Sequence, residues 1–272
     1  MVPALRMVET FKVKPTITEK PGAIRPGRLQ GEVILDKVTF GYEPSRLLLD
    51  KAELNVQPGT RIAVVGPSGT GKSTLLQLLL RLYDPLGGRV LVDGIDLRDF
   101  KIRSYLGRLG VVLQETFLFS NSVYENVRYG NPLASRDEVR KALSLADMNE
   151  VIENWPEGLD TFMGEGTNVS GGQKQRIGIA RALIRNPSVF IFDEPTAHLD
   201  IMAEQNVMQT IEKVTKDHTT FIVSHRIAPV LFVDRIAVVS GGGFEAVGTH
   251  KELLSSSPTY KMLWEEQQQQ AG

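Results

Sequence analysis

The sequence predicts an α/β fold in which helices cover both faces of a mostly parallel sheet. Short apolar runs at 61–66 (RIAVVG), 188–195 (SVFIFDEP) and 219–225 (TTFIVSH) have the length and composition of buried strands. Apolar residues recur at helical spacing over 72–83 and 203–215. Strands that alternate with helices indicate a parallel sheet, because each pair of parallel neighbours needs a crossover connection.

Two inner segments depart from this alternation. Residues 32–42 (EVILDKVTFGY) are rich in β-branched residues and alternate in polarity, which predicts an antiparallel β lead-in. Between about 116 and 185 the pattern is mostly helical, with a long helical stretch over 137–155, and it predicts an inserted α-helical lobe.

The two ends of the chain differ from the rest in composition and apolar pattern. Residues 12–30 hold three prolines and no apolar period, which predicts an extended lead-in, while Leu5, Val8 and Phe11 before them fall on one helical face. The glutamine-rich end, 264–272, is expected to be a fraying helix without an assigned function. The expected bounds are 1–30 for the lead-in, 31–255 for the main domain and 256–272 for a C-terminal helix or tail.

Composition excludes several classes of site. The 31 basic and 32 acidic residues nearly cancel, which argues against non-specific attraction to nucleic acid or anionic lipid, although a local patch remains possible. The chain has no cysteine and four scattered histidines, so a disulfide framework is excluded and a zinc site is not expected. No window approaches the roughly 18 unbroken apolar residues that a membrane span needs, so we expect the chain as given to be soluble.

The segment 66–73 matches the pattern G-x-x-x-x-G-K-S/T and lies between an apolar strand and an apolar-periodic helix. Glycines let backbone N–H groups turn toward phosphates, and the following helix adds the positive end of its dipole. Lys72 is expected to reach the β and γ phosphates, and Ser73 to ligate Mg²⁺. A turn that matches by chance is the alternative, which the flanking strand and helix disfavour. The predicted phosphate-binding residues are Gly66, Pro67, Ser68, Gly69, Thr70, Gly71, Lys72, Ser73 and Thr74.

Two carboxylates follow the apolar run VFIF at the predicted C-terminal end of a strand. Asp193 can hold Mg²⁺ there, as in other P-loop enzymes. Glu194 can take a proton from an attacking water, because adjacent residues of an extended strand point in different directions. A helix-capping role for Glu194 is the alternative.

A second glycine-rich turn, NVSGGQKQR over 168–176, also opens onto a predicted helix. With the phosphate loop, VSGGQ and IFDEPT in this order, the chain resembles the nucleotide-binding domain of ATP-binding cassette (ABC) proteins. The resemblance extends from about 30 to 255 and is strongest to the domains that follow the membrane helices of ABC exporters. It implies a P-loop NTPase (RecA-like) fold, ATP and Mg²⁺ as ligands, and ATPase activity.

The resemblance implies roles for three more residues around the nucleotide. Tyr42 matches the aromatic residue that stacks on adenine, and an ordinary strand aromatic is the alternative. Gln114 matches the glutamine that contacts Mg²⁺ and the attacking water and senses the membrane partner. His225 matches the switch histidine that touches the γ-phosphate, and a merely structural histidine is the alternative.

The second glycine-rich turn matches the ABC signature, and the resemblance implies that it serves a partner. In this family two nucleotide-binding domains pair head to tail, and each signature caps the ATP on the other P-loop. A hydroxyl, two glycines and a helix N-terminus suit contact with a γ-phosphate, so loss of that phosphate would release the dimer. The residues that match this interface are Ser170, Gly171, Gly172 and Gln173 of the signature, and Asp200 of the loop that crosses between domains.

The chain departs from the family pattern at three places. Val169 stands where leucine is commoner. The segment 161–168 has Phe162 in place of a glutamate and is one residue short, which puts its cross-subunit contacts in doubt. Ala197 and His198 replace a usual Ser-Ala pair, so hydrogen bonds from that serine are not expected.

The resemblance implies an ATPase that drives an ABC exporter at the cytoplasmic face of a membrane. Its expected partners are a second nucleotide-binding domain, in a homodimer or heterodimer, and a transmembrane domain in the same native chain. The lead-in resembles an exporter's connector, so the chain is expected to be part of a longer polypeptide.

Three other functions are alternatives. A soluble ABC ATPase that acts on nucleic acid or ribosomes is disfavoured because about 100 residues separate Lys72 from Ser170, too few for an inserted coiled coil, and because no basic stripe with interleaved aromatics is present. The ATPase subunit of an ABC importer is the nearer alternative. A small-molecule kinase would leave the signature unexplained.

Overall fold

The computed structural model describes residues 15–43, 45–164 and 167–271. The expected helical face of Leu5, Val8 and Phe11 lies outside these residues. The strands are β1 (Val33–Phe40), β2 (Leu49–Val56), β3 (Arg61–Val65), β4 (Gly87–Val92), β5 (Ile95–Asp96), β6 (Leu109–Val112), β7 (Asn121–Ser122), β8 (Phe162–Met163), β9 (Val189–Asp193), β10 (Thr219–Val223), β11 (Arg235–Ser240) and β12 (Gly243–Gly248). The helices are α2 (Lys72–Leu79), α3 (Ile102–Leu106), α4 (Val123–Arg128), α5 (Arg136–Leu145), α6 (Asn149–Glu153), α7 (Gly171–Leu183), α8 (Ile201–Val214), α9 (His250–Ser256) and α10 (Pro258–Ala271), with short 3-10 turns η1 (Leu97–Asp99), η2 (Gly158–Asp160) and η3 (Ala228–Val230).

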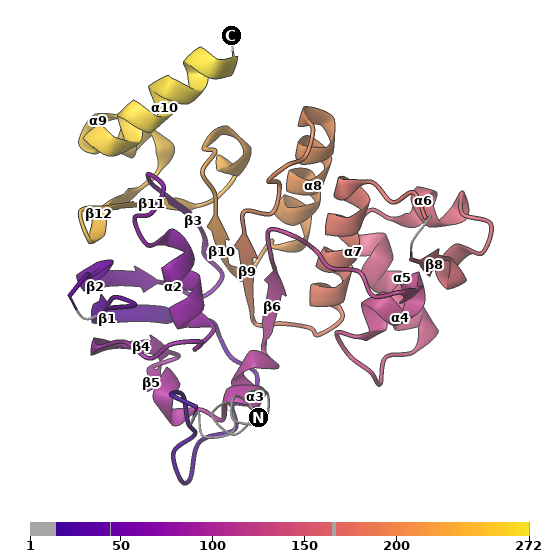
Figure 1. Cartoon of the computed structure of the whole chain (residues 1–272), viewed down its shortest axis with the longest axis horizontal. Helices are drawn as coiled ribbons and strands as arrows, with labels where there is room; N and C mark the ends of the chain where they lie inside the picture. The colour runs from indigo at the N-terminus through magenta and orange to yellow at the C-terminus, as the bar shows by residue number, and fades with distance from the viewer. Residues whose placement is uncertain (1–14, 44, 165–166, 272) are drawn as a thin grey trace, which may run out of the picture.

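The larger sheet of the described chain has six strands in the order β12-β11-β3-β10-β9-β6. The pairs among β11, β3, β10, β9 and β6 are parallel, and only β12 runs antiparallel to its neighbour. Alternate strand residues face opposite cores: Ile62 and Val64 belong to the cluster around α2, whereas Ala63 and Val65 belong to the cluster around α7 and α8. The predicted mostly parallel sheet with helices on both faces is therefore confirmed (Figure 1).

A second, antiparallel sheet in the order β2-β1-β4-β5 contains the antiparallel strand predicted over 32–42. Helix α2 lies between this sheet and the larger one (Figure 1). Four leucines of α2 are buried in the shared core because they occupy the helix faces that meet the two sheets. The helix that follows the phosphate loop is thus fixed from both sides.

The inserted lobe holds α4 to α7 and the short β7–β8 pair, which the sequence did not predict. The helical stretch expected over 137–155 is interrupted between α5 and α6, where Asp147 adopts a left-handed backbone with φ 54°. Its carboxylate accepts hydrogen bonds from Thr210 Oγ1 at 2.9 Å and Lys213 Nζ at 2.7 Å, both on α8. A tertiary contact therefore ends a helix that local pattern alone would continue.

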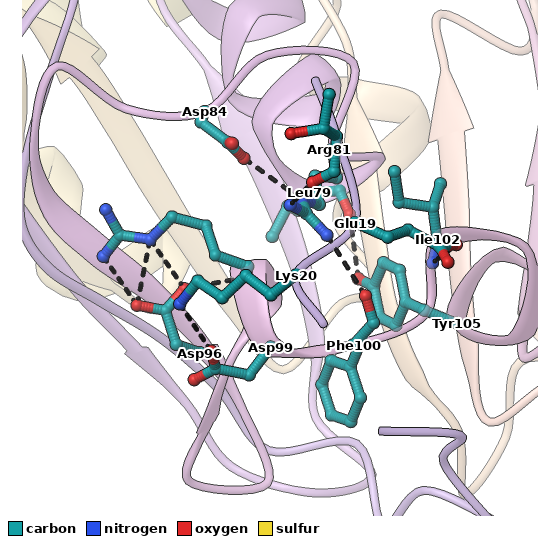
Figure 2. Close-up of polar contacts among 12 residues, drawn as sticks. Glu19, Lys20, Leu79, Arg81, Asp84, Asp96, Asp99, Phe100, Ile102 and Tyr105 are labelled. Carbon is teal, nitrogen blue, oxygen red and sulfur yellow. Dashed lines mark hydrogen bonds and ion pairs between the residues drawn. The ribbon is translucent and has the colours of Figure 1, made fainter. Parts of the chain in front are cut away.

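Arg81 ends the α2 region and turns the chain. Its backbone is left-handed, with φ 49°, so α2 stops at Leu79 instead of continuing to 83 as predicted. The guanidinium is buried and donates to Asp84 Oδ1, Phe100 O and Thr18 O, each at 3.1 Å. Figure 2 shows Arg81 at the centre of this polar cluster.

The described part of the lead-in, 15–30, is irregular but anchored to this cluster (Figure 2). Glu19 Oε1 accepts a hydrogen bond from the Ile102 amide at 2.9 Å, and Lys20 Nζ forms an ion pair with Asp99 at 2.6 Å. The expected extended segment is therefore held against the segment around η1 and α3 by a hydrogen bond and an ion pair.

The glutamine-rich end forms the expected helix. Helix α10 continues to Ala271 and is anchored by Tyr260, which is fully buried, and by Trp264, whose ring lies 4.7 Å from that of His250. Within the described residues, no helix is both long and apolar enough to cross a membrane.

Candidate active site

Four neighbouring parallel strands end at one edge of the larger sheet, and each leads to a predicted site residue. Strand β3 leads into the phosphate loop, β10 to His225, β9 to Asp193 and β6 to Gln114. Ligands of open α/β sheets bind in the crevice at the carboxyl ends of the strands. The topology therefore gathers residues that lie far apart in the sequence.

The phosphate loop places an uncapped helix N-terminus at this edge. Gly71 is the N-cap of α2 and has no side chain to accept its first N–H groups, so these remain available to an anion. Gly66 has φ 154°, and a Cβ there would lie 2.3 Å from Val239 O, so no other residue fits. The loop has the form of an anion cradle.

Lys72 is a buried cation at the base of this cradle, only 7% exposed. Its Nζ donates to Gly66 O and Pro67 O, both at 2.8 Å. Burial lowers the pKa of Lys72, and the charges of Glu194 and Asp193 oppose that shift. A phosphate beside Nζ would supply the negative charge that burial makes favourable.

The two predicted carboxylates lie close to each other and to this lysine. Burial raises the pKa of Asp193, the neighbouring Glu194 raises it further, and Lys72 opposes both. Glu194 has a left-handed backbone, with φ 44°, and its Oε2 lies 3.1 Å from His225 Nδ1. Strain of this kind in a non-glycine residue is common at functional sites, and it orients Glu194 toward the histidine.

The donor set fits Mg²⁺. Ser73, Gln114 and Asp193 would offer hydroxyl, amide and carboxylate oxygens, which are ligands that this hard cation prefers. In the described part of the chain no cluster of three or more His, Cys, Asp or Glu could hold a metal by itself. In phosphate-binding enzymes Mg²⁺ commonly takes its other ligands from substrate phosphates and water.

The loop that carries Gln114 is tied to α7 by a buried glutamine that the sequence analysis missed. Gln175 Nε2 donates to Leu113 O at 3.1 Å, and its Oε1 accepts from Thr116 Oγ1 at 2.8 Å. A polar residue on an otherwise apolar helix face was the available signal. A shift of α7 would therefore move the Gln114 loop.

Tyr42 lies in an aromatic cluster beside α2. Its ring makes edge contacts with Phe40, at 5.4 Å between centroids, and with Tyr83, at 5.3 Å. Its hydroxyl donates to Gln77 Oε1 at 2.5 Å, and half of the residue remains exposed. The arrangement suits stacking on a base, and Tyr83 is a member that sequence reasoning missed.

The signature turn opens α7 with a capping box. Ser170 Oγ accepts from the Gln173 amide at 3.2 Å, and Gln173 Oε1 accepts from the Ser170 amide at 3.0 Å. A Cβ on Gly171 would lie 2.7 Å from Leu199 Cδ2, so this glycine permits close packing on the following loop. Figure 1 shows α7 on the far side of β9 and β6 from α2, so the signature is not brought to its own phosphate loop.

The loop between β9 and α8 ends in another cap. Asp200 is the N-cap of α8 and accepts from the Ala203 amide at 2.9 Å, while His198 has φ 65°. Buried Glu204, also missed by sequence reasoning, accepts from Thr196 Oγ1 at 3.0 Å and Arg226 Nη1 at 2.5 Å. Glu204 therefore joins the loop after Glu194 to the loop of His225.

Known proteins share these features. A sequence model described as "ABC transporter" matches residues 49–197, more than half of the chain. The chain belongs to the ABC transporter family. This ABC domain contains the phosphate loop, the signature and both carboxylates inside the matched segment.

Full-length relatives indicate which kind of ABC domain it is. The chain is 42% identical over 261 residues to "Putative multidrug export ATP-binding/permease protein YgaD" of Bacillus subtilis, covering 95% of this chain and 45% of that protein. It is 42% identical over 259 residues to "Iron-sulfur clusters transporter ATM1, mitochondrial" of Chaetomium globosum, covering 93% and 43%. It thus spans less than half the length of these relatives.

A solved structure of an ABC exporter is also similar to this chain. "Structure of a bacterial Atm1-family ABC exporter with ATP bound" superposes with a TM-score of 0.89 at 36% identity, over 98% of this chain and 47% of that one. The chain is an ABC transporter ATPase domain homologous to the ATP-binding cassettes of exporters, which confirms the resemblance and the fold class. The roles of individual residues stay predictions.

The structure describes most of the residues at which the chain departs from the family pattern. Phe162 is in β8 and is exposed, and Val169 packs against the core beside α7. Residues 165 and 166 of the shortened segment lie outside the described residues.

Proposed function

We propose that this cassette binds Mg-ATP between two cassettes arranged head to tail, and that hydrolysis drives export by an associated membrane domain. The observation that carries the proposal is the convergence of a buried lysine, two carboxylates and a histidine at one sheet edge, beside an uncapped helix N-terminus. The family membership supports ATP as the nucleotide.

The proposed roles combine this geometry with those that the family resemblance implies. Tyr42 stacks on adenine, residues 66–74 bind the phosphates, and Ser73, Gln114 and Asp193 hold Mg²⁺, which would neutralise phosphate charge. Glu194 accepts a proton from water as the water oxygen bonds to the γ-phosphorus and the bond to ADP breaks. His225, already 3.1 Å from Glu194, orients that carboxylate and contacts the γ-phosphate.

A second cassette is the proposed partner at the signature. Ser170 is exposed at the N-terminus of α7, and α7 lies away from the phosphate loop of the same chain (Figure 1). Ser170 Oγ and the N–H groups of α7 would therefore reach the γ-phosphate of another copy or of a homologous cassette. Asp200 would contact that partner from the adjoining loop.

A membrane domain is the second proposed partner. An exposed aromatic patch formed by Phe117, Phe119 and Tyr129 lies on the lobe. Phe119 contacts Tyr129, with centroids 4.6 Å apart, and Arg181 stacks over Phe119 at 5.5 Å. An apolar patch of this kind suits a protein contact, and the "permease" in the name of YgaD suggests the occupant.

We infer from this partner that the cassette works at the cytoplasmic face of a membrane. The lead-in, 1–30, would connect it to the membrane domain. Residues 31–255 would form the nucleotide-binding domain and 256–272 its C-terminal helix.

Glu194→Gln tests the proposed chemistry and the proposed dimer together. The amide cannot take the water's proton, so turnover should fall by about 10² to 10⁴ while ATP binding persists. Light scattering should then report a dimer with Mg-ATP and a monomer without nucleotide. Wild-type turnover in this variant would exclude Glu194 as the base, and an ATP-loaded monomer would argue against pairing by the cassette alone.

A further inference from the structure

One face of α10 points from the core toward the loop of His225. Tyr260, Leu263, Trp264 and Gln267 recur at intervals of three or four residues and therefore share one side of the helix. Tyr260 is fully buried, and Leu263 and Trp264 pack against the core that includes α7 and α8. Gln267 lies one turn farther along and is the polar end of this face.

The amide of Gln267 bonds the backbone on both sides of Arg226. Its Nε2 donates to His225 O at 2.7 Å, and its Oε1 accepts from the Ile227 amide at 2.8 Å. Both hydrogen-bonding functions of the amide are thus used on the switch loop, 224–227. Its neighbours Gln268 and Gln269 are exposed.

The switch loop has a second attachment, on α8. Arg226 donates to the buried carboxylate of Glu204 at 2.5 Å, and Ser224 Oγ bonds the amide and carbonyl of Arg226. These contacts fix residue 226, whereas Gln267 fixes residues 225 and 227. The side chain of His225 is half exposed and bonds Glu194 Oε2, so the backbone sets where its ring lies.

We infer that Gln267 is a positioning residue for the ATPase reaction: through α10 it holds the backbone of His225 so that Nδ1 stays within reach of Glu194. This inference rests on the proposed role of His225. A displacement of about 1 Å at a catalytic group can cost about 10²-fold in rate. Loss of the Gln267 hydrogen bonds should therefore have a measurable effect on turnover. The glutamine-rich end is on this account part of the active-site scaffold.

Gln267→Leu keeps most of the side-chain volume and removes both hydrogen bonds. In the 272-residue chain, kcat should fall by about 5- to 20-fold while KM for ATP changes less than about 2-fold, since the binding loop is untouched. Gln267→Glu keeps an acceptor for the Ile227 amide and loses the donor to His225 O. Its kcat should therefore lie between those of wild type and Gln267→Leu. Gln268→Leu is the matched control on the exposed side and should match wild type.

Two further readouts separate positioning from general stability. Amide exchange at Ile227, measured by NMR or mass spectrometry, should accelerate in Gln267→Leu and not in Gln268→Leu. In a His225→Ala background, Gln267→Leu should lower kcat no further, because it acts through the histidine. Thermal unfolding of each variant checks that the fold is intact.

The outcomes are distinct. Equal kcat in Gln267→Leu and Gln268→Leu, or a full additional loss in the His225→Ala background, would overturn the positioning role while leaving the proposed function intact. Wild-type turnover in His225→Ala would instead remove the proposed role of the histidine and this inference with it. Loss of kcat together with faster Ile227 exchange and no additivity would support the inference.

Discussion

The two glycine-rich turns each open a helix, but they leave the helix ends in different states. The phosphate loop begins α2 from Gly71, which cannot cap it, and buries the cation Lys72 near Asp193, whose carboxylate is partly desolvated. The signature begins α7 from Ser170, and Gln173 completes a capping box within the same chain. In the phosphate loop no side chain caps the first N–H groups of the helix, whereas in the signature turn the Ser170 side chain caps the Gln173 amide.

The difference suggests how stability and function are distributed. Polar and charged groups at the phosphate loop should cost the unliganded fold some stability, because a bound ligand supplies the interactions that they lack without it. Groups in the signature turn should stabilise the fold even when no partner is present. Mutations at the two turns should therefore change stability in opposite directions, although both impair turnover.

The largest expected effect tests whether the turns belong to one composite site. Lys72→Ala and Ser170→Arg should each lose most ATP turnover, the first by weakening phosphate binding and the second by blocking the opposite site. Mixing the two variants should restore part of the wild-type rate, because a mixed dimer holds one site with intact Lys72 and intact Ser170. Turnover in the mixture equal to the mean of the separate variants would mean that each chain uses its own signature.

Asp193→Asn should abolish Mg²⁺-dependent turnover and yet raise the melting temperature at pH 7 by about 2 °C. Because the folded-state pKa of Asp193 is raised, its ionised form costs stability above that pKa, and the cost is lost as the pH falls toward 3.8. The advantage of the variant should therefore shrink between pH 7 and pH 4 in thermal unfolding. A lower melting temperature than wild type at pH 7 would contradict the comparison.

The smallest expected effect concerns the capping box. Gln173→Ala removes one of its two reciprocal hydrogen bonds and should lower the unfolding free energy by about 0.5 kcal/mol in urea titrations. Gln209→Ala, at an exposed position inside α8, serves as the control and should not destabilise. ATP binding by the monomer should be unaffected in both, since neither residue touches the phosphate loop.

Sequence patterns predicted the parts of this molecule that depend on neighbours in the chain. Local apolar runs and short motifs predict the buried strands, helices α2, α7 and α8, the position of Lys72 at the start of α2, and that of Asp193 and Glu194 at the end of β9. Family resemblance added the expected roles of Gln114, Ser170 and His225, whose spacing alone is uninformative.

The features that were missed depend on distant partners. Gln175 bonds Leu113 from 62 positions away, and Gln267 bonds His225 from 42 positions away. The break between α5 and α6 lies where Asp147 bonds Thr210 and Lys213 of α8. The periodicity of a local segment cannot predict such contacts, because they form only when distant segments meet in the folded chain.

The attachment of the lead-in bears on where this cassette can be cut. A chain started at residue 31, the expected boundary, would lack Thr18 O and leave one nitrogen of the buried Arg81 without its acceptor. It would also lose the bonds of Glu19 and Lys20 to the segment around α3. The smallest independently stable unit should therefore begin upstream of Thr18, and a protease that removes the lead-in should lower the melting temperature of what remains.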